Sequence, residues 1–537
     1  MLSRRVTIPQ LTMWASLFFV IFDNFAFFRN VLRTYTITLA DLVHCLSVPV
    51  LLSILIAFLL NIVCFRYTVK PILATLLPIS SLAAYFMDTY NVFIGTHMMQ
   101  NILETNANES LELLSPKLLF YFLFLGILPA FLVWKTEVIQ RPFRQEIVVK
   151  LKIAGILLIC TVGIFLAFSR FYTSFLRDHK PLRYYANPIY YIYSAGKYIH
   201  ESFKEKITVI TPLGKDAVNS PSDKGPELII MVVGEAARSD HFSLNGYHRE
   251  TNPLLKQEDV ISFSNVLSCA TTTAISVPCM FSHLGRAGYT DKKAKSSENV
   301  LDVLSHAGVS VLWRDNNSDS KDVALRVDYE EFKKQQTNPE CDEIECRDVG
   351  MLNGLQRYID SHKEKDILVV LHQMGNHGPA YYKRYPKSFE RFVPVCQTNE
   401  LSDCAREEIV NAYDNAILYT DYFLSRVINL LKQNSGDFET AMVYFGDHGE
   451  SLGENGIYLH GVPYAIAPRA QIEIPAIFWF GERFKVDRDK LRRNIDNDYS
   501  QDNLFHTLLG MMEIKTAVYN KDLDIINSDP VQRVGIK

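Results

Sequence analysis

Hydrophobic residues are distributed unevenly along the chain, and the pattern changes near residue 170. The first third contains five long apolar runs, each approaching the roughly 20 residues that a helix needs to cross a bilayer core. They are Leu11–Phe28, Leu42–Cys64, Pro71–Met87, Leu118–Trp134 and Ile153–Phe168. No small-residue cleavage site follows the first run, so we expect it to be retained as an anchor. Residues 1–170 are therefore predicted to form an α-helical transmembrane domain of five spans.

Basic residues predict how these spans are oriented. They lie before the first span (Arg4, Arg5), between the second and third (Arg66, Lys70), and between the fourth and fifth (Lys135, Arg141, Arg144, Lys150, Lys152). Because Lys and Arg are enriched in cytoplasmic loops, we expect these segments in the cytoplasm, although Arg29 and Arg33 lie on the opposite side. An odd number of spans then places everything after Phe168 outside the cytoplasm.

Residues 171–224 are expected to form an interfacial helix followed by a linker. The first part is rich in aromatic side chains, namely Tyr184, Tyr185, Tyr190, Tyr191, Tyr193, Tyr198 and Phe203. Amphipathic rings favour the membrane–water boundary, so we expect a partly helical segment on the outer leaflet. Packing of these rings against the soluble domain is the alternative. The run Thr211–Pro226, with Pro, Gly, Ser and charged residues, predicts a linker.

From residue 225 onward, short apolar runs alternate with segments of helical spacing. The runs Leu228–Val233, Val309–Trp313, Ile367–Leu371 and Thr440–Phe445 are typical of buried strands. Asn299–His306 and Glu407–Lys432 show helical spacing. Alternation of this kind predicts an α/β domain over residues 225–537, with a largely parallel sheet and helices on both faces. Ligands of such sheets bind beyond the carboxyl ends of the strands.

Composition adds a compartment to this picture. The chain has 537 residues and a formal net charge of -4, which gives no indication of nucleic-acid binding. Six cysteines of the soluble part form three close-set pairs, Cys269–Cys279, Cys341–Cys346 and Cys396–Cys404. Short spacings in a domain outside the cytoplasm predict three disulfides, and six unpaired thiols are the alternative.

Metal-ligand residue types follow several of the predicted strands. They are Glu235, His372, His377, Asp447 and His448, with His460 in a loop further on. Each histidine alone is more often an ordinary loop or core residue, but the fold brings several strand ends to one edge of the sheet. Carboxylate and imidazole together suit zinc better than magnesium or calcium, so a zinc site is predicted at that edge.

A nucleophile is expected near the same edge. The segment from Cys269 to Cys279 offers Thr271, Thr272, Thr273 and Ser276. A hydroxyl needs a base or a metal to act as a nucleophile, and a helix start behind it would present N–H groups to a phosphate. The alternative is a threonine-rich helix cap. The chemistry alone does not choose among the three threonines.

The chain resembles the lipid A phosphoethanolamine transferases of the EptA and mobilised colistin resistance (MCR) type. The resemblance covers almost the whole length and includes VVGEAARSDHFSLNGY, SCATTTAISVPCMFS, WRDNNSDSK, LHQMGNHGPAYY and GDHGESLGENGIYLHG. It implies that residues 225–537 form a periplasmic catalytic domain of alkaline phosphatase/sulfatase type. Ala270 and Ile275 stand where the threonine motif frequently has Gly and Tyr. Neither difference alters an expected ligand.

The resemblance also implies roles for single residues. Glu235, Thr273, Asp447 and His448 match ligands of a main zinc ion, and Thr273 matches the residue that carries phosphoethanolamine covalently. His377 and His460 match residues that hold the substrate phosphate or a second zinc. Lys321, His372, Asn101 and Glu109 match other substrate-binding positions.

The implied reaction moves phosphoethanolamine from phosphatidylethanolamine to lipid A, which would weaken binding of polymyxins such as colistin. We expect a monomer in the bacterial inner membrane, surrounded by lipids and without a nucleic-acid partner. The nearest alternative is transfer of phosphoethanolamine or phosphoglycerol to another envelope glycan or core sugar. A sulfatase is disfavoured because Thr273 stands where it needs Cys or Ser. A catalytically inactive binding module is disfavoured because every expected ligand position holds a competent residue.

Overall fold

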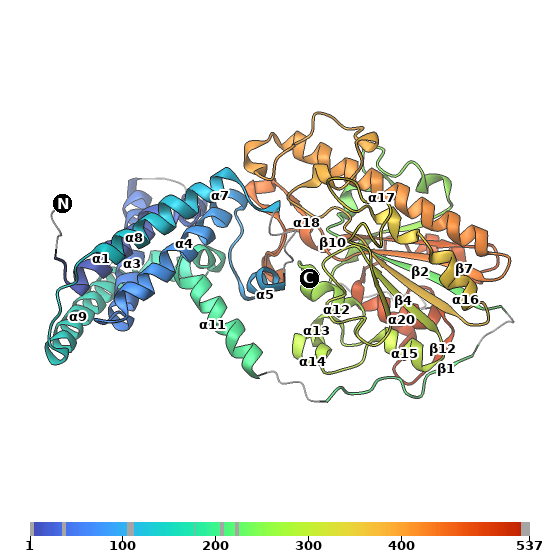
Figure 1. The fold of residues 1–537 in the computed structure, drawn as a ribbon, viewed down its shortest axis with the longest axis horizontal. Helices are drawn as coiled ribbons and strands as arrows, with labels where there is room; N and C mark the ends of the chain where they lie inside the picture. The colour runs from blue at the N-terminus through green and yellow to red at the C-terminus, as the bar shows by residue number, and fades with distance from the viewer. Residues whose placement is uncertain are drawn as a thin grey trace. The chain divides into compact units, whose positions relative to one another are not determined.

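The computed structural model describes residues 5–34, 39–104, 112–177, 179–204, 209–220 and 225–527. The chain divides into two compact units. The first comprises Met1–Ile102 and Leu113–Phe203, and the second comprises Leu103–Glu112 and Lys204–Lys537. Helices make up the first unit, whereas the second contains a sheet flanked by helices (Figure 1).

The helices of the N-terminal part include several that are long enough to cross a membrane. They are α1 (Ile8–Phe22), α2 (Phe25–Thr34), α3 (Leu39–Val63), α4 (Val69–Tyr90), α5 (Thr96–Glu104), α7 (Pro116–Phe120), η1 (Tyr121–Ile127), α8 (Leu128–Lys135), α9 (Phe143–Ala167), α10 (Ser169–Arg177), η2 (Lys180–Tyr185) and α11 (Ile189–Lys204). Four candidate spans occur among the described residues: Val43–Val63, Val69–Tyr90, Pro116–Lys135 and Phe143–Ala167. A fifth exists if α1 and α2, which are bent by 57° at their junction, count as one span.

The bend interrupts the first apolar run, which the hydrophobic pattern predicts as one continuous helix. Asn24 lies in the break, and its side-chain amide donates to the backbone carbonyl of Phe19 at 2.9 Å. Asp88 of α4 accepts the backbone N–H of Ala26 at 2.8 Å. Polar side chains thus replace helical backbone partners at this point, and a new helix begins at Phe25.

The aromatic segment from Tyr184 to Phe203 packs within the first unit. The hydroxyl of Tyr185 donates to the carbonyl of Asn91 at 2.7 Å, and both Tyr185 and Tyr191 are buried. Asn187 donates to the carbonyls of Asp23 at 3.0 Å and Ser80 at 2.9 Å. Two of the rings are therefore buried within the first unit, and Tyr193 is exposed. Packing against the soluble domain, the alternative to an interfacial position, does not describe Tyr185, whose hydroxyl bonds to Asn91 of the first unit. The position of this segment on the outer leaflet stays a prediction.

The second unit is built on an eight-stranded sheet with the order β11-β3-β10-β7-β2-β6-β4-β5. Its strands are β2 (Glu227–Gly234), β3 (Ile261–Leu267), β4 (Ser310–Asp315), β5 (Asp328–Glu331), β6 (Ile367–His372), β7 (Glu439–Gly446), β10 (Glu473–Phe480) and β11 (Tyr499–Ser500). Strand β10 is antiparallel to both neighbours, and the other pairs are parallel. The four strands predicted from apolar runs are confirmed as β2, β4, β6 and β7, and the sheet is largely parallel as expected.

Helices cover both faces of this sheet (Figure 1). The helices of this unit are α12 (Thr273–Met280), α13 (Gly285–Gly288), α14 (Asp291–Lys295), α15 (Val300–His306), α16 (Leu355–Ser361), α17 (Arg406–Asn434), α18 (Arg469–Ile472), α19 (Arg488–Arg493) and α20 (Leu504–Met511). Ile229, Met231 and Val233 of β2 belong to one core cluster with residues of α12, α15 and α20. The alternate residues of β2 are equally buried, and α17 packs against β7 on the other face. Two small two-stranded sheets, formed by β1 (Val218–Asn219) with β12 (Ile514–Lys515) and by β8 (Ser451–Leu452) with β9 (Tyr458–Leu459), complete the unit.

Candidate active site and metal centre

The carboxyl ends of two neighbouring parallel strands bring metal-ligand side chains together. Gly234, the last residue of β2, pairs in register with Gly446, the last residue of β7. Glu235 directly follows the first of these glycines, and Asp447 and His448 follow the second. Parallel strands end at the same edge of a sheet, so these three side chains converge where ligands of such folds bind.

Thr273 completes this cluster from the first position of α12. Its Oγ1 donates to Oε2 of Glu235 at 3.1 Å and lies 3.2 Å from Nε2 of His448. The same Nε2 lies 3.5 Å from Oε1 of Glu235 and 3.3 Å from Oδ2 of Asp447. The start of a helix also favours an anionic group, because its N–H groups and its dipole point toward it.

The structure separates Thr273 from the two threonines before it. Oγ1 of Thr271 donates to the backbone carbonyl of Val462 at 2.8 Å, which is a structural contact. The hydroxyl oxygen of Thr272 is buried and has no hydrogen-bond partner among the described residues. Thr273 therefore stands out by geometry, since its hydroxyl faces the buried carboxylate and imidazole. The Cys269–Cys279 disulfide joins the loop before α12 to a residue near the end of that helix.

The donor set fits a bound cation. Glu235 and Asp447 are 1% and 0% exposed, and the ligand atoms of Glu235, Asp447 and His448 all lie within 4.8 Å of one another. Oε1 of Glu235 and Oδ2 of Asp447 are buried without a hydrogen-bond partner in the described part of the chain. Burying ionised carboxylates without compensation costs several kcal/mol each, so a positive ion between them removes a large penalty.

Neighbouring groups orient these ligands. Nδ1 of His448 lies 2.8 Å from the backbone carbonyl of Gly449, which favours a proton on Nδ1 and leaves Nε2 free to coordinate. Oδ1 of Asp447 accepts the backbone N–H groups of Ala236 at 2.9 Å and His448 at 2.6 Å. Asn317 donates to Oε2 of Glu235 at 2.8 Å and to the carbonyl of Gln373 at 2.7 Å.

The electrostatics of the cluster favour positive charge at its centre. Burial raises the pKa of Glu235, and the charge of Asp447 raises it further. Burial opposes the charged form of His448, yet the carboxylates of Asp447 and Glu235 leave its pKa raised. The two carboxylates repel each other and attract a positively charged imidazole, so the cluster favours a cation between them.

Two more histidines lie next to this cluster. The ring centroid of His460 is 4.3 Å from that of His448 and 6.3 Å from that of His377. Nδ1 of His460 lies 2.7 Å from Oε2 of Glu450, whose Oε1 accepts the hydroxyl of Tyr381 at 2.6 Å. His448, Glu450 and His460 form a second group with metal-ligand spacing.

His377 lies beside His460, and Lys321 is near enough for its charge to act on His377. Burial, followed by the charge of Arg384, lowers the pKa of His377 well below its ordinary value, and the charge of Lys321 contributes. Nδ1 of His377 is buried without a hydrogen-bond partner in the described part of the chain. A neutral imidazole with a free lone pair suits a metal ligand or a hydrogen-bond acceptor. The side chain of Lys321 is 7% exposed, and its Nζ donates to the carbonyl of Ser318 at 3.4 Å.

The remaining predicted site residues lie elsewhere or are not described. His372 is 0% exposed, its Nδ1 lies 2.9 Å from Oδ2 of Asp315, and its Nε2 has no hydrogen-bond partner among the described residues. Asn101 lies in α5 of the first unit. Glu109 lies outside the described residues. Their proposed roles in substrate binding stay predictions.

Two contributing residues were missed by the sequence analysis, namely Glu450 and Asn317. Glu450 stands three residues after Asp447 in the same motif, so its position was a usable signal. Asn317 also lies in a quoted motif, but nothing in the sequence indicates its hydrogen bond to Glu235. Its function depends on the β4 end lying near the β2 end, which only the strand order shows.

Comparisons with known proteins agree with this geometry. Residues 227–514 match the family described as "Sulfatase", and residues 51–203 match "Phosphoethanolamine transferase EptA/EptB". The fold and the ligand cluster thus define an enzyme of the alkaline phosphatase and sulfatase class attached to membrane helices.

Relatives that match over almost the whole chain identify the family within this class of enzymes. The Escherichia coli "Phosphatidylethanolamine transferase Mcr-1" is 44% identical over 93% of each chain. "Phosphoethanolamine transferase EptA" of Escherichia coli (strain K12) is 37% identical over 98% of this chain and 99% of its own. The structure of the integral membrane lipooligosaccharide phosphoethanolamine transferase A (EptA) from Neisseria meningitidis matches with a TM-score of 0.94 and 34% identity, covering 98% of this chain and 99% of that one.

The chain belongs to the EptA and Mcr family of phosphoethanolamine transferases. It is a multi-pass inner-membrane enzyme whose catalytic domain lies in the periplasm. The comparisons confirm the family, the fold class and the cellular compartment that the sequence predicts.

Proposed function

We propose that this enzyme transfers phosphoethanolamine from phosphatidylethanolamine to lipid A through a covalent intermediate on Thr273. The observation that carries the proposal is the position of the Thr273 hydroxyl, 3.1 Å from Glu235 Oε2 and 3.2 Å from His448 Nε2, at the start of a helix. Phosphatidylethanolamine and lipid A are the donor and acceptor that the relatives' names and the family resemblance suggest.

In the first step Oγ1 of Thr273 attacks the phosphorus of phosphatidylethanolamine. A bond forms between this oxygen and phosphorus, and the bond between phosphorus and the diacylglycerol oxygen breaks. The proton lost by the threonine hydroxyl ends on diacylglycerol, which leaves as an alcohol. Glu235 and His448 are within hydrogen-bond distance of the hydroxyl and orient its lone pair toward the phosphorus.

In the second step an oxygen of a lipid A phosphate attacks the same phosphorus. A phosphorus–oxygen–phosphorus bridge forms, the bond to Thr273 breaks, and the proton of the attacking phosphate hydroxyl ends on Thr273. Lys321 compensates negative charge on the transferred group, and His377 and His460 contact this group directly or through a second zinc. The neutral imidazole of His377 can accept a proton, so it also suits proton transfer.

The chain's ligand set for zinc is Glu235, Thr273, Asp447 and His448. Zinc bound by these residues supplies Lewis-acid stabilisation of negative charge and a lowered pKa of the Thr273 hydroxyl. His377 and His460 are the residues for a second zinc or for direct contact with the phosphate. The observation that supports a cation here is the pair of buried, unpartnered oxygens on Glu235 and Asp447.

The membrane unit anchors the enzyme where both lipid substrates reside. Asn101 and Glu109 would contact a lipid head group from the segment between the third and fourth predicted spans. The product carries an added ammonium group that offsets a lipid A phosphate charge. Cationic polymyxins such as colistin then bind more weakly, because their attraction to lipid A is largely electrostatic. We propose that a single chain suffices for this reaction.

Mass spectrometry of lipid A from cells that express the chain tests the proposal. Lipid A should gain one phosphoethanolamine group, and the minimal inhibitory concentration of colistin should rise. A matched culture with the empty vector is the control. If the group appears on a core sugar and lipid A is unchanged, the acceptor is wrong while the transfer chemistry stands.

Replacing Glu450 by glutamine should lower kcat/KM for diacylglycerol release about tenfold or more, the usual effect of losing a group that orients a ligand. The carboxylate accepts hydrogen bonds from both Tyr381 and His460, whereas an amide turns a donor toward one of them. Glu227→Gln is the matched control, because Glu227 is also buried but lies at the opposite end of β2. Unchanged kinetics in Glu450→Gln would remove Glu450 from the site.

A further inference from the structure

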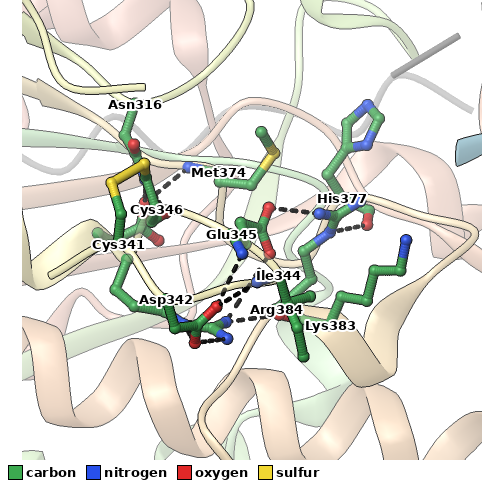
Figure 2. Close-up of polar contacts among 12 residues, drawn as sticks. Asn316, Cys341, Asp342, Ile344, Glu345, Cys346, Met374, His377, Lys383 and Arg384 are labelled. Atoms are coloured by element: carbon green, nitrogen blue, oxygen red, sulfur yellow. Dashed lines mark hydrogen bonds and ion pairs between the residues drawn. A yellow bond between two sulfur atoms is a disulfide. The ribbon is translucent and has the colours of Figure 1, made fainter. Parts of the chain in front are cut away.

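A small disulfide ring lies beside the loop that carries His377 (Figure 2). Cys341 and Cys346 close the ring, and the side chain of Asp342 accepts the backbone N–H groups of Ile344 and Glu345, each at 2.8 Å. The ring is therefore internally braced. Glu345 projects from it toward the His377 loop (Figure 2).

Arg384 connects this ring to the backbone of His377. Its guanidinium pairs with the carboxylate of Glu345, and its Nε donates to the carbonyl of His377 at 2.6 Å. The side chain of Arg384 is 2% exposed, so these contacts are shielded from water. In Figure 2 the carbonyl of His377 faces Arg384, while its imidazole extends in the opposite direction.

The other end of the same loop is held just after the ring. The carboxylate of Asp348 accepts the backbone N–H groups of Met374 at 2.8 Å and Gly375 at 3.1 Å. Gly375 has φ of +51°, and a Cβ there would come within 3.0 Å of the backbone of Glu235. The loop is thus packed tightly against a predicted metal ligand and has little freedom on that side.

We propose that Arg384 is a positioning residue that directs the imidazole of His377 into the active site. A planar guanidinium can donate from Nε to a carbonyl and from a terminal nitrogen to a carboxylate at once. With the His377 carbonyl fixed, the side chain has fewer directions to sample, and it reaches the transferred group already aligned. This inference rests on the role proposed above for His377.

A double-mutant cycle in the full-length, zinc-loaded enzyme tests it. Arg384→Lys keeps the positive charge but cannot donate to the His377 carbonyl and the Glu345 carboxylate at once. The kcat for diacylglycerol release should therefore fall about tenfold, with KM changed less than about twofold. In a His377→Ala background the same substitution should cause no further fall, because the residue through which it acts is gone. Arg314→Lys is the matched control, since Arg314 is also buried and donates to the carbonyls of Met351 and Asn353.

Equal losses from Arg384→Lys in both backgrounds would overturn the inference, as would an equal loss from Arg314→Lys, because either result means a general structural role. If His377→Ala itself keeps full activity, both the proposed role of His377 and the inference about Arg384 are wrong. If His377→Ala has reduced but measurable activity and the losses are multiplicative, only the inference about Arg384 falls.

A second measurement covers variants that fold poorly or react too slowly. Glu345→Gln leaves Arg384 in place and weakens its anchor, so a smaller loss is expected that also disappears in the His377→Ala background. Carbethoxylation of His377, followed by peptide mass spectrometry, needs no activity. It should be faster in Arg384→Lys than in the wild type and in Arg314→Lys, and equal rates in all three would contradict the proposal.

Discussion

Replacing Thr273 by alanine is expected to lower transfer of phosphoethanolamine to lipid A by more than about a thousandfold, the scale seen when an enzyme loses its nucleophile. The hydroxyl is the group that faces Glu235 and His448, and no other threonine of the segment does so. The variant should still insert into the membrane, because the substitution removes a small side chain at a helix start.

Two matched variants make this result specific. Thr272→Ala should keep wild-type activity, because the Thr272 hydroxyl has no hydrogen-bond partner among the described residues. Thr273→Ser should keep part of the activity, since it retains an oxygen at the same position. Lipid A mass spectra report transfer, and peptide mass spectra of the wild type should show phosphoethanolamine on Thr273. Transfer by Thr273→Ala would refute the covalent mechanism.

Removing metal with a chelator should abolish diacylglycerol release and lower the Tm of the purified enzyme, and added zinc should restore both. Without a metal ion, the carboxylates of Glu235 and Asp447 are buried together, and one oxygen of each has no hydrogen-bond partner among the described residues. A ligand present at a thousandfold excess over its Kd stabilises the folded state by about 4 kcal/mol, so the shift in Tm should amount to several degrees.

Asp447→Asn is the variant that identifies the site of this effect. It removes one carboxylate, keeps the shape of the side chain, and should make Tm insensitive to both chelator and zinc. Glu227→Gln alters a buried carboxylate at the far end of β2 and should leave the zinc response intact. If metal analysis finds no bound metal and the enzyme is still fully active, the proposed metal centre is contradicted.

Much of the catalytic unit could be predicted from the chain because its central strands are continuous apolar runs. Strand β2 is buried on both faces, so every residue from Leu228 to Val233 is apolar and the run is unmistakable. Ligands that directly follow such strands, like Glu235 and Asp447, can be predicted with them. The structure also distinguishes Thr273 from Thr271 and Thr272, which the chemistry of the segment could not do.

Other features depend on contacts that a linear pattern does not contain. Strand β10 includes Pro475 at a register shift, and β3 has polar residues on its half-exposed face, so neither is a clear apolar run. The break after α1 depends on partners in other helices. Arg384 looks like an ordinary surface arginine in the sequence, because its burial requires Glu345 and the His377 loop to be in place.

The pairing of β2 with β7 has a consequence for how the enzyme is made. Ala236 and Asp447, which meet in a hydrogen bond at the metal centre, are 211 positions apart in the chain. During synthesis and export, Glu235 and Thr273 reach the periplasm long before Asp447 and His448 do. The centre can form only after β7 has joined the sheet, so a chain that stops before Glu439 has no complete site. Metal can therefore bind to the complete site only after His448 has been synthesised and exported.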